Sequence, residues 1–270
     1  MGSRSIRTTA PPLTGWRLLP AALFSLVLTS LHTQAETTDS AHPSPPSEGQ
    51  HILLATRAEY RASYKKGVPI RGSAIRTLEK LENGDWQYRF DVSSFIVDIS
   101  ETLHFQWNDS QLLPIKYNYE RSGWVKSKQS NASFDWQSKQ VRYDINNDSR
   151  TISIPPLTLD RLGYQLQLRL DLARGKEEMH YTVADKGRLR EFVFAVTGEE
   201  SLQGENSSFP CVVVEKIREP DSSRQTKLWF AQQQGYLLVK MSQVEPDGEK
   251  YQIVLQKAQV GDQIFEPRIK

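Results

Sequence analysis

The stretch "TLDRLGYQLQLRLDL", residues 158–172, decides the fold, because it fits two patterns at once. From residue 164 to residue 172 apolar and polar residues alternate, as they do in a half-buried strand. Its Leu, Gln and Arg residues nevertheless favour a helix, and no Val, Ile or Thr occurs in residues 159–174.

The residues on either side also favour a helix. Prolines 155–156 end the preceding strand, and Gly175 stands where a helix stop belongs. Thr158 or Asp160 can cap the N-terminus. We therefore predict one α-helix near residues 158–173.

Such a helix has apolar residues on two opposite sides, since successive residues turn by about 100°. It cannot lie on a surface with one side in water, so we expect it to be held inside a curved sheet. One side carries Leu159, Leu162, Leu166 and Leu170, and the other carries Leu157, Tyr164, Leu168 and Leu172.

The rest of residues 51–260 consists of short alternating runs separated by turn residues, which predicts about a dozen strands. Asn83-Gly84 marks one hairpin, and "WQYRFDVSSFIVDI" (86–99) is the run that follows it. No long helical crossovers separate the runs, so the sheet should be antiparallel. The predicted fold is all-β dominated: a single strongly curved antiparallel sheet, a half-barrel or open barrel, holding one helix in one domain.

Three stretches resemble the exported bacterial family catalogued as domain of unknown function 3108. They are "LDRLGYQLQLRLDL" (159–172), "DKGRLREFVFAVTGEESL" (185–202) and "RQTKLWFAQQQGYLLVKMSQVEPDGEKYQIVL" (224–255). The chain departs from the family at Gly163, which stands at a Ser-like position, and at Leu238, where the family often has Pro. The resemblance implies a curved sheet holding a helix, similar in outline to periplasmic lipoprotein carriers, and it supplies no catalytic motif.

The N-terminal residues predict export. Three Arg residues, an apolar run over residues 18–31 and a small-x-small ending indicate a signal peptide, residues 1–35, cleaved after Ala35. An uncleaved anchor is the alternative. Residues 36–50 are Pro/Ser-rich and predict a disordered tether, and residues 261–270 predict a C-terminal tail. We expect a protein of the Gram-negative periplasm that contacts the membrane only through the signal peptide before cleavage.

The charge of the chain argues against a nucleic-acid partner. Of 34 basic and 32 acidic side chains, the predicted signal peptide removes three Arg and no acid, which leaves 34 − 3 = 31 against 32. No surplus remains to neutralise phosphates. Cys211 is the single cysteine, so no intramolecular disulfide forms, and its apolar run predicts a buried thiol.

No motif for catalysis or for a cofactor is present. The five His residues lack metal-ligand spacing, and P-loop, dinucleotide and G-x-S-x-G patterns are absent. Neighbouring carboxylates such as Glu199 and Glu200 point to opposite faces of a strand. We expect no metal, no cofactor and no enzymatic activity; a hydrolase with a noncontiguous carboxylate site is the alternative.

Aromatic alternation is the strongest candidate for a site. If the aromatic faces of neighbouring strands coincide, they form a concavity for a lipid or other amphiphile, although an ordinary packed core has the same pattern. We predict a binding or carrier protein for an apolar or amphiphilic envelope component; an interaction module whose edge strands pair with an envelope protein is the alternative. The predicted site comprises Trp86, Tyr88, Phe90, Phe105, Trp107, Tyr117, Tyr119, Phe134, Trp136, Leu166 and Leu170.

Overall fold

The structure is a computed structural model that describes residues 53–108, 111–146, 148–205 and 208–269. The chain divides into two units, residues 1–47 and 48–270, and every described residue belongs to the second. The predicted signal peptide and tether lie outside the described residues.

The described residues form fifteen strands, one α-helix and one short 3-10 helix. The first eight strands are β1 (Thr56–Lys66), β2 (Val68–Lys80), β3 (Trp86–Ser94), β4 (Val97–Asn108), β5 (Gln111–Gly123), β6 (Lys128–Asp135), β7 (Gln140–Ile145) and β8 (Asp148–Ser153). After them come α1 (Gly163–Ala173), β9 (Glu178–Asp185), β10 (Arg188–Gln203), β11 (Ser208–Ile217), β12 (Gln225–Ala231), η1 (Gln232–Gln234), β13 (Leu237–Val244), β14 (Lys250–Val260) and β15 (Gln263–Phe265).

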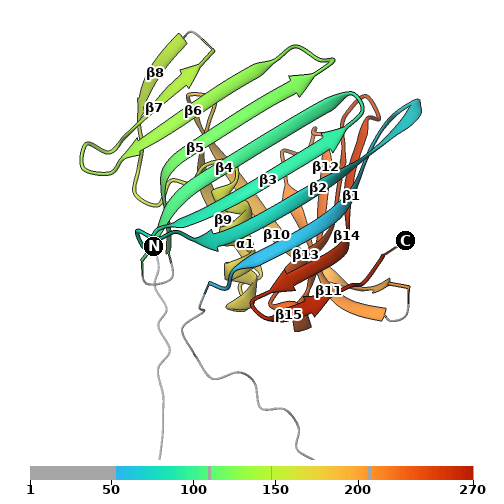
Figure 1. The fold of residues 1–270 in the computed structure, drawn as a ribbon. Coiled ribbons are helices and arrows are strands. Elements are labelled where there is room, and N and C mark those ends of the chain that lie inside the picture. The colour runs from blue at the N-terminus through green and yellow to red at the C-terminus, as the bar shows by residue number, and fades with distance from the viewer. Residues whose placement is uncertain (1–52, 109–110, 147, 206–207, 270) are drawn as a thin grey trace, which may run out of the picture. The chain divides into compact units, whose positions relative to one another are not determined.

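All fifteen strands belong to one sheet, and each named pair is antiparallel. The order is β8-β7-β6-β5-β4-β3-β2-β1-β14-β13-β12-β11-β10-β9, with β15 added beside β14. Strands β1 to β8 form one wall and β9 to β14 another, and β1 joins the two by pairing with β14 (Figure 1). The two end strands, β8 and β9, are not paired with each other, so the barrel is open along one seam. This confirms the predicted fold class.

Bulges contribute to the curvature, because an extra residue on one strand bends it and increases its twist. A sheet with this many strands also curls through its own twist. Register shifts occur at Glu59/Tyr60, His104/Phe105, Val196/Gly198 and Trp229/Phe230.

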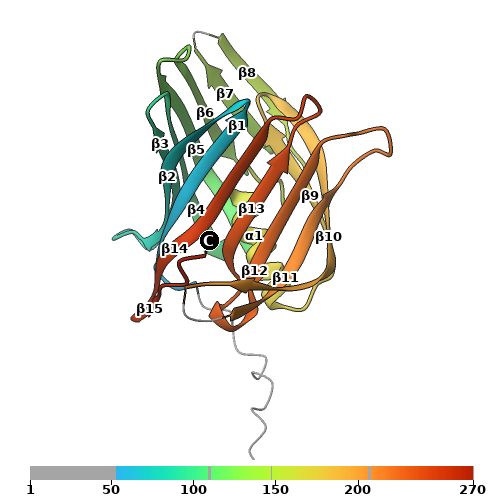
Figure 2. The ribbon, with the colours of Figure 1, turned by 90° about the vertical axis from the view of Figure 1, so that its right-hand side faces the viewer.

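Helix α1 lies between the two walls (Figure 2). Its four leucines Leu166, Leu168, Leu170 and Leu172 are 2%, 0%, 7% and 2% exposed, although they lie on opposite sides of the helix. Asp171 fixes the C-terminal end, because it accepts a hydrogen bond from the Tyr181 hydroxyl of β9 at 2.9 Å. A helix with two buried apolar sides, held in a curved sheet, is what the leucine pattern predicts.

The helix begins at Gly163, later than the predicted start near residue 158. The preceding residues are extended instead, and Leu159 forms a parallel bridge with Val183 of β9. The Leu159 N–H donates to the Thr182 carbonyl at 2.9 Å. This short contact runs along the free edge of β9, so the connection to α1 covers part of the seam. Leu157 was wrongly assigned to a buried helix face: it lies before the bridge, has φ +65° and is 57% exposed.

Two other boundaries differ from the predictions. The run 86–99 is divided by a turn at Phe95 and Ile96, and its last residues belong to β4. Residues 261–270 are not merely a tail, because they contribute β15, and Ile269 is 4% exposed. In the described part, no helix is long and apolar enough to cross a membrane.

Candidate functional site

The predicted aromatic residues of β3 to β5 share the inner face of the sheet. Residues paired across antiparallel strands point to the same side, so the register decides this directly. The cross-strand rows are Trp86–Phe105, Tyr88–Leu103–Tyr117 and Phe90–Glu101–Tyr119. Phe134 and Trp136 stack on each other with ring centroids 5.8 Å apart, and the indole of Trp136 donates to the Pro114 carbonyl at 2.7 Å.

Most of this aromatic face is packed. Tyr88, Phe105, Tyr117 and Phe134 are each at most 9% exposed. The other five residues are half-buried and pack against the same core: Trp86, Phe90, Trp107, Tyr119 and Trp136. The aromatic residues therefore form a wall, and the space for a ligand lies in smaller cavities beside it.

Three cavities adjoin α1 or its N-terminal connection, and they divide the predicted site residues. Leu166 and Leu170 line the base cavity, of about 330 Å³. Tyr88 lines the arginine cavity, of about 30 Å³. Tyr117 and Tyr119 line the seam cavity, of about 90 Å³. The remaining six aromatic residues of the predicted site line none of these three cavities.

The base cavity is mainly apolar and lies at the C-terminal half of α1. Helix α1 forms one side of the cavity. Residues of β2, η1, β14 and β15, together with Gly235 and the residues before β1, form the rest. Its polar groups include Arg169 and Gln234. The complete lining is Leu53, Leu54, Leu78, Leu166, Arg169, Leu170, Ala173, Gln233, Gln234, Gly235, Val260, Gln263, Ile264 and Phe265.

Arg169 connects the base cavity with the arginine cavity, because it lines both, as does Leu78. The Arg169 Nε donates to the Gly235 carbonyl at 2.9 Å, and burial lowers the pKa of its guanidinium. Among the described residues it has no carboxylate partner. Gln234 Oε1 is also buried and has no hydrogen-bond partner in the described chain.

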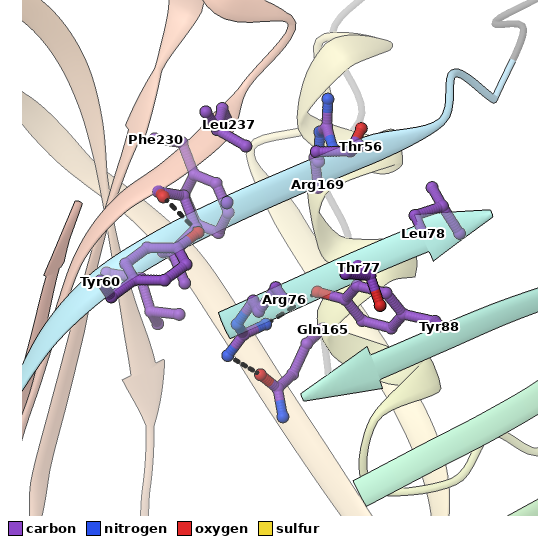
Figure 3. Close-up of a pocket in the computed structure, with 13 residues that line it drawn as sticks. Thr56, Tyr60, Arg76, Thr77, Leu78, Tyr88, Gln165, Arg169, Phe230 and Leu237 are labelled. Carbon is purple, nitrogen blue, oxygen red and sulfur yellow. Dashed lines mark hydrogen bonds between the residues drawn. The ribbon is translucent and has the colours of Figure 1, made fainter. Parts of the chain in front are cut away.

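Arg76 of β2 is the second cation of the arginine cavity, and it is only 5% exposed (Figure 3). It donates to the Tyr88 hydroxyl at 2.8 Å and to Gln165 Oε1 of α1 at 2.7 Å. Its guanidinium carbon lies 4.3 Å from the ring centre of Phe90. Its Nε has no hydrogen-bond partner within the described structure, and no carboxylate there forms an ion pair with it. A buried, unpaired arginine is costly unless an anion offsets it.

Tyr60 of β1 also faces the arginine cavity. Its hydroxyl donates to the Leu238 carbonyl at 2.9 Å. Burial raises the pKa of this phenol well above its usual range, and the charges of Arg76 and Arg169 oppose that shift. Both guanidinium groups therefore act electrostatically on the same side chain, from β2 and from α1.

The sequence prediction missed Arg76, Gln165 and Arg169. The sequence nevertheless pointed to Arg76. In an alternating strand it shares a face with Ala74 and Leu78, so its side chain must point inward as theirs do. A charged residue at such a position indicates either an ion pair or a ligand.

Lys216 of β11 is a further polar group on the inner face. Its ammonium lies 2.8 Å from the ring centre of Phe192, and 5.6 Å and 6.0 Å from those of Phe194 and Tyr164. Burial, followed by the charge of Arg218, lowers the pKa of Lys216 to about 7.

The described residues hold no group of three or more His, Cys, Asp or Glu side chains that could bind a metal ion. Cys211 is buried, and burial raises the pKa of its thiol to about 11, which disfavours the reactive thiolate.

The fold and its cavities define a class of protein: an open, barrel-like antiparallel sheet that encloses one helix. The chain belongs to the family described as protein of unknown function (DUF3108), whose pattern matches residues 59–256. The exported bacterial character that the resemblance implied stays a prediction.

The fold is similar to that of a solved structure from Brucella abortus, a β-barrel-like protein of domain of unknown function DUF1849. The two share 11% sequence identity, and the alignment covers 77% of this chain and 98% of that one with a TM-score of 0.52. A second structure, MucB in complex with MucA(peri), aligns over 80% of this chain and 91% of that one at 7% identity. Its TM-score of 0.15 does not support a shared fold. No curated protein matches the chain.

Proposed function

We propose that this protein binds, without covalent chemistry, an amphiphile with a long apolar chain and an anionic head. The apolar chain would occupy the base cavity beside Leu166 and Leu170. The head would lie toward the arginine cavity, between Arg169 and Arg76. The observation that carries this proposal is a mainly apolar cavity of about 330 Å³ that shares Arg169 with a second cavity containing Arg76.

Size and lining both support a ligand. Small-molecule sites are typically concave, about 300–1,000 Å³ in volume, mostly apolar and equipped with a few polar groups. The base cavity meets each of these criteria. An anionic head would also supply the missing partner of Arg76, because guanidinium groups form strong paired hydrogen bonds with carboxylates.

Laurate and dodecanol provide a matched test, since they share a twelve-carbon chain and differ in the charge of the head. Isothermal titration of the full chain should show saturable binding of laurate. Decanoate, which lacks two methylenes, should bind about fifteenfold more weakly, at about 0.8 kcal/mol per methylene. Failure of both laurate and dodecanol to bind would overturn the proposal.

Variants locate the site. Arg169→Gln should weaken laurate binding about tenfold or more and leave dodecanol binding unchanged, because only laurate carries the charge that Arg169 would meet. Leu170→Trp should fill the base cavity and weaken both ligands. Arg71→Gln is the matched control, since Arg71 lies on β2 with an exposed side chain and lines none of the three cavities. Equal losses in Arg71→Gln and Arg169→Gln would place the ligand elsewhere.

A further inference from the structure

The seam cavity is a second polar site, separate from the cavities of the proposed function. It lies where the inner face of β5, β6 and β7 meets the β9–β10 turn and the connection that leads into α1. Its volume is about 90 Å³. Since one water-sized sphere needs about 10–15 Å³ of such volume, the cavity admits several small polar groups but no long chain.

Cations from four separate segments line this cavity: Arg121 of β5, Lys128 of β6, Arg161 before α1 and Lys186 of the β9–β10 turn. Asp185 is the single carboxylate in the lining. It forms ion pairs with two arginines: Arg161 lies 3.7 Å from its Oδ1, which accepts no hydrogen bond within the described residues, and Arg190 lies 3.2 Å from its Oδ2. The lining therefore carries a formal surplus of three positive charges.

Two of these cations are not engaged by the protein. Lys128 and Lys186 form no ion pair and no side-chain hydrogen bond within the described residues. Burial and the charges of Arg161 and Lys128 lower the pKa of Lys186, against the opposing effect of Asp185. A bound anion would relieve this repulsion.

The buried end of the cavity also presents an unused polar group. Tyr143 is 1% exposed and lines the cavity, yet its hydroxyl has no hydrogen-bond partner in the described part of the chain. Ser130, which is 5% exposed, lines the same cavity. Buried hydroxyl groups are normally satisfied, so an unpaired one facing a cationic cavity indicates a missing acceptor.

We infer that the seam cavity binds a phosphate group, with Lys128, Lys186 and Arg161 compensating its charge and Tyr143 donating to one of its oxygens. A tetrahedral oxyanion offers several acceptors within a small volume, and arginine and lysine are the usual partners of phosphate in proteins. The phosphate can come from free phosphate or from a phosphate monoester such as a lipid head group. The inference is independent of the amphiphile proposal, because the seam cavity shares no lining residue with the base or arginine cavity.

Isothermal titration of the full chain with inorganic phosphate and with glycerol 3-phosphate tests the inference, at fixed ionic strength adjusted with chloride. Saturable binding of either supports the site, and the tighter of the two identifies the source of the phosphate. Lys128→Gln and Lys186→Gln should each weaken binding about tenfold, since each removes a charge-assisted contact. Lys126→Gln is the control, because Lys126 is exposed between β5 and β6 and lines none of the three cavities.

Two results would overturn the inference. One is the absence of any heat beyond that of the chloride control. The other is undiminished binding in the Lys128→Gln/Lys186→Gln double variant, which would show an adventitious ion only. Thermal unfolding of each variant without phosphate confirms that it folds, so that a loss of binding is not a loss of structure.

Discussion

Asp160 is a fully buried carboxyl group just before α1, and its replacement by asparagine should change how stability depends on pH. Asp160 is 0% exposed, and its Oδ1 accepts hydrogen bonds from the N–H groups of Leu162 and Gly163 at 2.8 Å and 3.0 Å. Burial raises the pKa of Asp160 to about 6, although these two hydrogen bonds oppose the shift. An asparagine at the same position retains the Oδ1 acceptor and carries no charge.

The sign and size of the effect follow from linkage. Because the folded pKa of Asp160 lies above its ordinary value of 3.8, the folded state holds the proton more tightly than the unfolded chain does. The stability that Asp160 contributes is therefore complete below about pH 4 and is lost as the pH rises through about 6. The difference between the folded and unfolded pKa values of Asp160 corresponds to about 3 kcal/mol of stability in total. About 2 kcal/mol of this stability is lost between pH 4.5 and pH 8.

Urea unfolding of the protein and of Asp160→Asn at pH 4.5 and at pH 8 measures this difference. The free energy of unfolding of the variant should fall by about 2 kcal/mol less between the two pH values than that of the unaltered protein. Asp262→Asn is the matched control, since it makes the same Asp-to-Asn replacement at an exposed position. Parallel pH dependences for the protein and Asp160→Asn would refute the reasoning.

Three further outcomes are expected. Leu168→Ala should lower the free energy of unfolding in urea by about 2–5 kcal/mol, because Leu168 is 0% exposed. Leu157→Ala, at an exposed leucine, should change it by less than about 0.5 kcal/mol. Similar values for the two variants would contradict the burial of the helix. Gly163→Ala should destabilise the folded protein by about 1–3 kcal/mol, although alanine has the better helix propensity. The alanine Cβ would lie 2.7 Å from Asp160 Oδ2, which is too close. An increase in Tm would show that the surrounding structure relaxes. The Lys216 ammonium should titrate near pH 7 by NMR. The free energy of unfolding should rise as the pH increases above 7, because the folded state loses the Lys216 proton at a lower pH than the unfolded chain does. A titration midpoint near pH 10.5 would be inconsistent with the buried environment of Lys216.

The helix could be predicted from its sequence because its leucines leave no side suited to water. Leu166 and Leu168 lie on opposite sides, and a curved sheet is the environment that buries both. Its start could not be predicted, because Leu159 follows the free edge of β9, and that edge exists only once the sheet has formed.

The aromatic face, too, could be predicted only in part from the sequence. Alternation alone places Tyr88 and Phe90 on one side of a strand. Which residues of the next strand meet them depends on register, and the bulge at His104/Phe105 changes the register within β4. The cavities depend on how closely the helix approaches each wall. The alternation within single strands therefore could not predict that Arg76 and Arg169 line the same cavity.

The pairing of β1 with β14 has a consequence for how the chain folds. Thr56 lies opposite Val260, which is 204 residues later, whereas the other strands of each wall pair with near neighbours in the chain. Each wall can therefore assemble from local hairpins, and joining the walls must await the last long strand. Until then β1 exposes an unpaired edge that invites pairing with another chain. The step that joins the two walls therefore also covers the exposed edge of β1.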